Sequence, residues 1–325
     1  RLDRMPLLAL LRAQPSHGQA VVLMFIATLG WSIAGVVARQ ITQAQGFEVT
    51  FWRSFFTALS VALGLTLWRR GAIWRETGFR DKALWLSGLC WSVMFTAFML
   101  ALTMTTVANV LITLSLGPLL TALLHRVWSK QPLALHTWLC IAMAAVGIAY
   151  MFASQMHLDA GQHWQGMLVA VGVPMAGSVQ WNLMNRQGSN QTSPNMLPAI
   201  LIGAVLSCLF TAPWAFPSHA SVADMQWLVL LGVCQLAIPC ALAVWSSQAL
   251  KPHEVAMLAL LEVIFGIALA WLGAGEAPGP RVLMGGTLVL LALFGNGVER
   301  QFSFVAEQGF LVCQEHQSKS FPVSL

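Results

Sequence analysis

Charged side chains are scarce in this chain. Only 9% of its 325 residues are Asp, Glu, Lys or Arg, whereas a soluble domain carries about 25%. The chain is instead 57% hydrophobic, and its mean hydropathy is +0.70. Too little polar surface remains for a water-soluble globule, so the composition predicts a polytopic membrane protein.

The motifs of soluble enzymes and of nucleic-acid-binding proteins are also missing. The six cysteines form no Cys-x-x-Cys pair, and the sequence has no P-loop, no His-Glu-x-x-His, no nucleophile elbow and no paired Asp motif. The net charge of +5 comes from Lys and Arg in loops and near the chain ends rather than from one basic face. We therefore expect no enzyme activity, no cofactor, no metal site and no nucleic-acid partner.

Long hydrophobic runs recur along the chain. A helix needs about 20 mainly apolar residues to cross the hydrocarbon core of a bilayer. The runs predict an all-α polytopic membrane protein with ten transmembrane helices. The predicted spans are 20–39, 48–67, 83–102, 106–125, 136–153, 164–184, 194–213, 225–249, 254–272 and 281–297. We expect segments 1–19 and 298–325 to lie outside the membrane.

Basic and acidic residues fall on opposite sides of this predicted bundle. If the N-terminus is cytoplasmic, the inner loops hold most of the Lys and Arg residues. The outer loops then carry Glu48, Asp159, Asp224 and Glu276. Because cytoplasmic loops are enriched in Lys and Arg, we expect both termini in the cytoplasm.

The two halves of the chain share short sequences at a nearly constant offset. Gly88-Leu89-Cys90 matches Gly232-Val233-Cys234 at an offset of 144, Ala34-Gly35 matches Ala176-Gly177 at 142, and Val107-Ala108 matches Val255-Ala256 at 148. Repeats of five spans each, at 20–154 and 164–297, must enter the membrane in opposite orientations because five is odd. Inverted repeats of this kind are typical of secondary transporters.

Several short motifs resemble those of EamA-type ten-helix exporters in the drug/metabolite transporter superfamily. They are Gly30-Trp31-Ser32, Phe51-Trp52-Arg53, Gly117-Pro118-Leu119, Leu261-Glu262-Val263 and Gly285-Gly286. Val263 stands where this family usually has proline, and Gly117 where a Glu is expected. The Glu that usually closes each helical hairpin is Glu276 in the second half but Gln131 in the first.

The resemblance implies a monomeric bundle in a bacterial-type inner membrane. It also implies a central cavity lined by spans 1, 3, 4, 6, 8 and 9, and transport by alternating access. The nearest functional relatives are exporters of amino acids, including aromatic ones.

Glu262 is the only ionisable residue between Val255 and Leu272 in the ninth span. A charge at this depth costs about 2.5–3.5 kcal/mol on insertion scales. Because carboxylates inside membranes are usually paired, the first interpretation is a structural bond to a neighbouring helix. Binding of a substrate amine and carriage of a coupling proton remain alternatives.

Polar and aromatic residues at helical spacing supply the other candidates for a binding site. Ser and Thr commonly support helix packing instead, and Trp is a common filler of bundle interiors. An unpaired amide, in contrast, is costly in hydrocarbon. The expected substrate-binding residues are Trp31, Ser32, Trp91, Thr96, Asn109, Thr113, Gln180, Trp181, Gln235, Trp245 and Glu262.

Three prolines fall near the middle of predicted spans. Pro118, Pro174 and Pro239 each remove a backbone donor and favour a kink. We interpret them as hinges, with simple kinking for packing as the alternative.

The sequence thus favours a secondary transporter that exports small amphipathic metabolites, with amino acids as the best guess. A broad drug or metabolite exporter is the alternative within transport. A membrane-embedded enzyme or scaffold would need a catalytic constellation or a soluble docking face, and the sequence shows neither.

Overall fold

A computed structural model of the chain describes residues 15–44, 46–68, 79–129, 135, 138–140, 142–143, 145–147, 149–150, 163–188, 196–250, 255 and 258–291. The predicted terminal segments, except residues 15–19, lie outside these ranges, as does part of the fifth span. Every regular element in the described residues is a helix.

The helices occupy the ten predicted places. Among the described residues, seven helical runs are long and apolar enough to cross a membrane, and three shorter apolar helices fall in the fifth, ninth and tenth places: Trp138–Gly147, Leu261–Ala274 and Pro280–Leu291. The elements are α2 (His17–Ser32), α3 (Ala34–Ala38), α4 (Phe47–Trp68), α6 (Lys82–Met104), α7 (Val107–Leu114), α8 (Gly117–Ser129), α10 (His163–Gly188), α11 (Leu197–Ala215), α12 (Val222–Leu230), η2 (Leu231–Ala237), α13 (Ile238–Ser246) and α15 (Leu261–Ala274). The predicted all-α fold with ten spans is confirmed.

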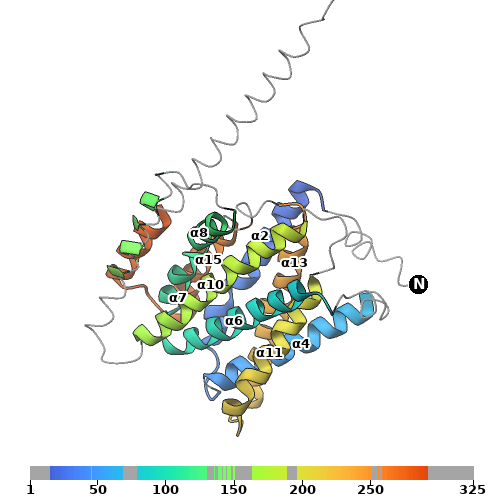
Figure 1. The fold of residues 1–325 in the computed structure, drawn as a ribbon. Helices are drawn as coiled ribbons and strands as arrows, with labels where there is room; N and C mark the ends of the chain where they lie inside the picture. The colour runs from blue at the N-terminus through green and yellow to red at the C-terminus, as the bar shows by residue number, and fades with distance from the viewer. Residues whose placement is uncertain are drawn as a thin grey trace, which may run out of the picture.

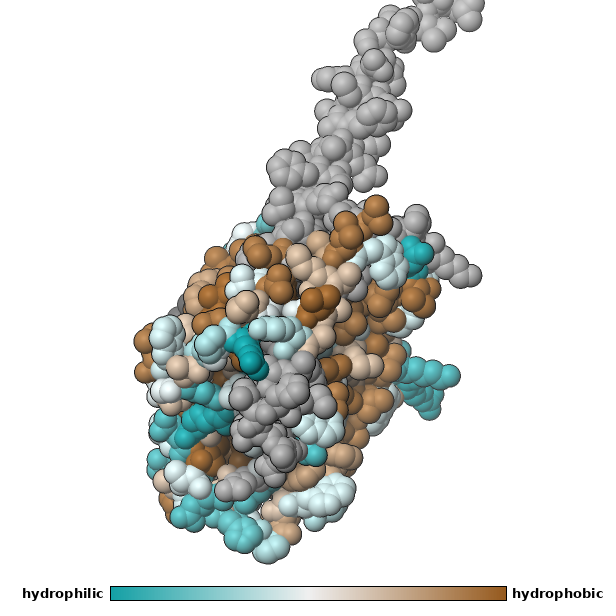
Figure 2. Space-filling view, turned by 90° about the vertical axis from the view of Figure 1, so that its left-hand side faces the viewer, coloured by the Kyte–Doolittle hydropathy of each residue, from teal (hydrophilic) through white to brown (hydrophobic). Residues whose placement is uncertain are grey.

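Large apolar side chains cover the outside of the bundle. Leu63, Leu209 and Leu272 are 54%, 65% and 83% exposed. Figure 2 shows hydrophobic residues over much of one flank and hydrophilic residues gathered towards one end. An exposed apolar surface of this extent is what lipid contact requires.

Helices of the first half of the chain pack against helices of the second half, in corresponding pairs. The third span, α6, packs on α10 and α11 of the sixth and seventh spans, while η2 and α13 of the eighth pack on α2 and α4 of the first and second. Likewise α8 packs on α10, and α15 on α2. In Figure 1, α6 lies between α10 and α11, with α4 beside α11. Such reciprocal packing is expected of two repeats that are related by a pseudo-two-fold axis.

The glycines that first indicated the repeat occupy matching helix crossings. A Cβ atom at Gly88 would collide with Ile202 and lie 3.5 Å from the carbonyl oxygen of Ala199. A Cβ at Gly232 would lie 2.6 Å from Phe56 Cβ and 2.8 Å from the carbonyl oxygen of Arg53. Both glycines therefore permit close approach of the helix backbones at the crossings of α6 with α11 and of η2 with α4.

We expect Gly232→Ala to destabilise the protein because the backbone of α4 cannot move away from the added methyl group. Overpacking of this kind costs about 1–3 kcal/mol. Thermal unfolding in detergent would measure the loss. Gly64→Ala in α4 is the matched control, since a Cβ there meets nothing within 4 Å; equal effects of the two substitutions would contradict the crossing.

Candidate functional site

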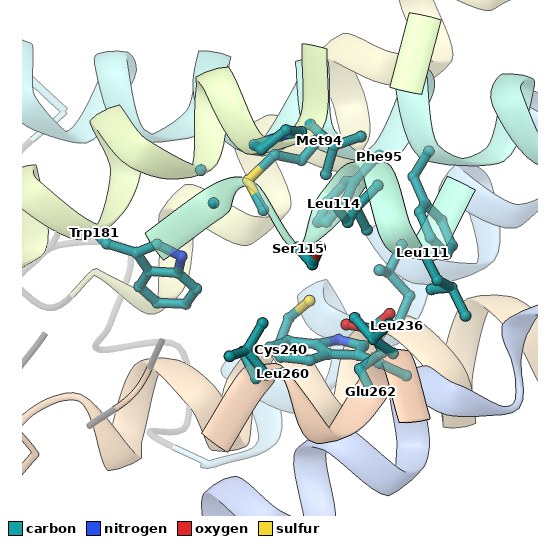
Figure 3. A pocket seen from close by; sticks show the side chains of 18 of the residues that line it. Met94, Phe95, Leu111, Leu114, Ser115, Trp181, Leu236, Cys240, Leu260 and Glu262 are labelled. Carbon is teal, nitrogen blue, oxygen red and sulfur yellow. The ribbon is translucent and has the colours of Figure 1, made fainter. Parts of the chain in front are cut away.

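A partly open cavity lies at the junction of the two repeats. It encloses about 900 Å³ when the space open to solvent is counted. Its lining comes from the six spans that the resemblance implied and from the second span, which contributes Arg53. In Figure 3, Ser115 lies across the cavity from Cys240 and Glu262, and Trp181 lies at one side.

Aromatic side chains form part of the cavity wall. Trp31, Trp91 and Trp181 all line it. The Trp91 ring meets Trp181 edge-on at 6.3 Å between centroids and Phe95 at 5.4 Å. Of the four deep tryptophans predicted to bind substrate, Trp245 lies outside this lining, in α13.

Arg53 is a functional candidate that we did not select from the sequence. Its side chain is 1% exposed and lines the cavity from α4. Its Nε donates to Gln235 Oε1 at 3.2 Å and its Nη1 to the Phe95 carbonyl oxygen at 3.2 Å. The guanidinium also lies 5.7 Å from the centre of the Phe98 ring. A cation inside an apolar span is expensive, and that signal in Phe51-Trp52-Arg53 could have identified it.

Glu262 faces the same cavity from the first turn of α15 and is half-buried. Its carboxylate makes no hydrogen bond to any residue that the structure describes. The structural interpretation required such a bond. Glu262 and Arg53 interact electrostatically, although no nitrogen–oxygen pair between them lies within 4.0 Å in the described structure.

Several predicted binding residues make local bonds outside this lining. Ser32 donates to Thr28 O and Thr113 to Asn109 O, each at 2.7 Å. Asn109 Nδ2 donates to Thr105 Oγ1 at 3.0 Å. Ser32 and Thr113 thus bond within their own helices, as the packing interpretation expects. Asn109 differs, because its Oδ1 is buried and has no partner in the described structure.

Two further candidates lie between helices. Thr96 of α6 shares a hydrogen bond of 2.8 Å with Ser207 of α11. Gln180 of α10 is fully buried, and neither end of its amide has a partner in the described structure. Neither residue lines the cavity, and their roles in binding stay predictions.

The three predicted hinge prolines differ in their surroundings. Pro118 follows a break between α7 and α8, and Pro239 follows the π-helix η2, whereas Pro174 lies within the continuous helix α10. Pro239 has no N–H to give to the carbonyl of Gln235, four residues earlier. The wider helical turns there place Gln235 beside Arg53. Hinge motion itself stays a prediction.

Asp224, near the start of α12, ties the first repeat to the second. Its carboxylate is 1% exposed and accepts backbone N–H bonds from Thr42, Gln43 and Ala44 at 2.9–3.2 Å. A fourth bond comes from the N–H of Ser221 at 3.2 Å. One buried carboxylate therefore satisfies donors on both sides of the repeat junction.

Glu48, near the start of α4, makes the reciprocal connection. Its Oε1 accepts bonds from the Ser218 hydroxyl and from the N–H groups of His219 and Ala220, at 2.6–2.8 Å. The loop before α12 is thus held to α4, as the loop before α4 is held to Asp224.

Glu276, just beyond α15, completes a third connection at this end. It accepts a bond from Arg39 Nη2 at 3.2 Å and from the Val107 N–H at 3.3 Å. Arg39 also donates to the carbonyl oxygens of Leu102 and Thr105. Glu48, Asp224 and Glu276 therefore bind together one end of the bundle, which we call the clasped end; it is the end predicted to face outward.

The exposure of the cavity lining differs along the fourth span. Leu111, one turn from the clasped start of α7, is 3% exposed. Leu114, Gly117 and Pro118, farther along the same span, are partly exposed, as is Trp181. Some lining residues farther from the clasped end are thus partly exposed, whereas Leu111 near it is buried.

No three His, Cys, Asp or Glu side chains gather closely enough to hold a metal ion among the described residues. The cavity lining is suited to an organic molecule: aromatic and aliphatic walls carry a few polar groups, as is typical of small-molecule sites.

The first half of the chain is similar to a known family. Residues 18–153 match the EamA-like transporter family, a range close to the predicted first repeat. No curated protein sequence matches the chain. This chain is also similar to a protein of known crystal structure, with a TM-score of 0.58 and 17% sequence identity. The alignment covers 88% of this chain and 99% of the chain in that crystal structure. That likeness concerns the fold alone, and it covers both halves of the chain.

Proposed function

We propose that this membrane protein, with its EamA-like first half, is a secondary transporter that exports small amphipathic metabolites by alternating access. Amino acids, including aromatic ones, are the proposed substrates. The observation that carries the proposal is the partly open cavity at the repeat junction, whose lining comes from both halves of the chain. Two equivalent repeats give the bundle two related ways to pack around such a site.

The proposal includes the setting in which the transporter works. It acts as a monomer in a bacterial-type inner membrane with both termini in the cytoplasm. The cavity then faces the cytoplasm, where an exporter must collect its substrate.

Purified protein in liposomes tests transport. We expect saturable counterflow of labelled phenylalanine, which requires only a binding site that alternates between the two sides. Flux of many unrelated drugs without preference for amino acids would favour the alternative, a broad exporter. Formation of a product without flux would overturn transport.

Trp181→Ala should raise the transport KM for phenylalanine about tenfold, because a ring against this wall contributes about 1.4 kcal/mol when it is partly buried. Trp271→Ala is the matched control, since Trp271 is 58% exposed on α15 and does not line the cavity. Equal KM values for the two variants would contradict an aromatic wall that binds substrate.

A further inference from the structure

The cavity carries two ionisable groups of opposite type among its described lining residues apart from Cys240. They are the guanidinium of Arg53, on α4, and the carboxyl group of Glu262, on α15. The remaining lining is aromatic, aliphatic or small and neutral, apart from Gln235, Ser115 and Cys240. The charges therefore decide which polar groups a ligand must bring.

Arg53 is held firmly, yet its hydrogen-bonding capacity is not filled. A guanidinium has five N–H donors, and two of its nitrogens bind Gln235 and the Phe95 carbonyl. Nη2 makes no hydrogen bond within the described structure. Both acceptors are uncharged, so this 1% exposed cation has no direct counter-ion in the described residues. A buried charge without an ion partner is costly, and an anionic ligand group would remove that cost.

Glu262 has the complementary need. Its carboxylate can accept several hydrogen bonds and receives none from the described residues. It does not pair directly with Arg53, since no nitrogen–oxygen pair of theirs lies within 4.0 Å in the described structure. Both groups line the same cavity, so each is available for a charge-assisted bond to a ligand there.

We propose that Arg53 and Glu262 form a two-pole site for zwitterions, in which Arg53 binds the carboxylate and Glu262 the ammonium group of an α-amino acid. The aromatic wall of Trp31, Trp91 and Trp181 contacts the side chain of the amino acid. Gln235 is a positioning residue that orients the guanidinium through Nε. The inference rests on the proposed function, since it names the substrate class of the same cavity.

Three ligands test the two poles on the purified full chain by calorimetry. They are phenylalanine, phenylalaninamide, which lacks the carboxylate, and 3-phenylpropionate, which lacks the ammonium group. The unmodified protein should bind phenylalanine at least tenfold more tightly than either analogue. Equal affinity for phenylalanine and its amide, or no binding of phenylalanine, overturns the site without any variant.

Variants assign each pole. Arg53→Gln should abolish the preference for phenylalanine over its amide and keep the preference for phenylalanine over 3-phenylpropionate. Glu262→Gln should keep the first preference and abolish the second. Gln235→Leu should reduce the preference for phenylalanine over phenylalaninamide and leave the preference over 3-phenylpropionate unchanged. If the affinities for all three ligands fall equally, Gln235 has only a structural role. Arg126→Gln is the matched control, since Arg126 stacks on Trp138 outside the cavity.

The outcomes separate this inference from the proposed function. Tight, selective binding without liposome counterflow leaves the two-pole site and overturns transport. If phenylalanine shows counterflow but Arg53→Gln lowers the affinities for phenylalanine and its amide equally, transport stands and the two-pole site is overturned. If Arg53→Gln does not fold, Arg53→Lys keeps the charge but loses the forked geometry, and it should reduce the preference over the amide at least threefold; an unchanged preference overturns the assignment of Arg53.

Discussion

Asp224→Ala lowers the thermal stability of the protein more than loss of an ordinary helix cap does. The substitution leaves the N–H groups of Thr42, Gln43, Ala44 and Ser221 without their acceptor. An unsatisfied buried donor costs about 1–3 kcal/mol. Even if water reaches some of these groups, we expect a loss of about 4 kcal/mol, measurable as earlier thermal unfolding in detergent.

Asp81→Ala is the matched control for this prediction. Asp81 caps α6 with one bond, to the Ala83 N–H at 2.9 Å, and loss of an N-cap costs about 1 kcal/mol. Equal shifts in unfolding temperature for the two variants would show that the clasp at Asp224 adds nothing beyond capping.

The fold could be predicted because its signals are local. Hydrophobic run length alone placed the ten spans, and the odd number of spans per repeat required their inversion. The offset between Gly88 and Gly232 was informative for a physical reason: each glycine admits a neighbouring backbone at a matching crossing. The division into repeats and terminal segments remains a prediction.

The breaks within spans were harder to predict. Proline marked two of them, at Pro118 and Pro239, yet Pro174 lies in an unbroken helix. The turn at Ile33 between α2 and α3 has no proline at all. Whether a helix breaks depends on what its neighbours offer to the freed backbone groups, and a single sequence does not show those neighbours.

The site shows the same division. Trp31, Trp91, Trp181, Gln235 and Glu262 were predicted from the cost or size of their side chains, and all line the cavity. Hydroxyl residues such as Ser32 and Thr113 were predicted from helical spacing and instead bond within their own helices. Spacing identifies a face of a helix but does not say whether that face meets a cavity or another helix.

Arg53 was overlooked because it lies near a predicted span end, where a cation could reach the interface. In the fold its side chain instead turns inward to Gln235 and Phe95. The same applies to Glu276. Its place after the ninth span predicted closure of a hairpin, but its contacts with Arg39 and Val107 join it to the other repeat.

Glu276→Ala is expected to open the clasped end more often. The substitution removes the ion pair with Arg39, whose side chain is 32% exposed, and the acceptor for the Val107 N–H. Partly exposed contacts of this kind contribute about 1–2 kcal/mol together, and 1.4 kcal/mol shifts a two-state population about tenfold.

The reactivity of Cys240 measures this opening, in a variant whose other cysteines have been replaced. Cys240 lines the cavity and is 1% exposed. In proteoliposomes, a membrane-impermeant thiol reagent added on the clasped side should modify Cys240 about tenfold faster in Glu276→Ala. Arg281→Ala removes an exposed charge at the same end without touching the clasp, and it should leave the rate unchanged. If Cys240 is modified as slowly in both variants as in the protein with an intact clasped end, Glu276 does not hold that end closed. Glu48 and Asp224 are then sufficient to do so.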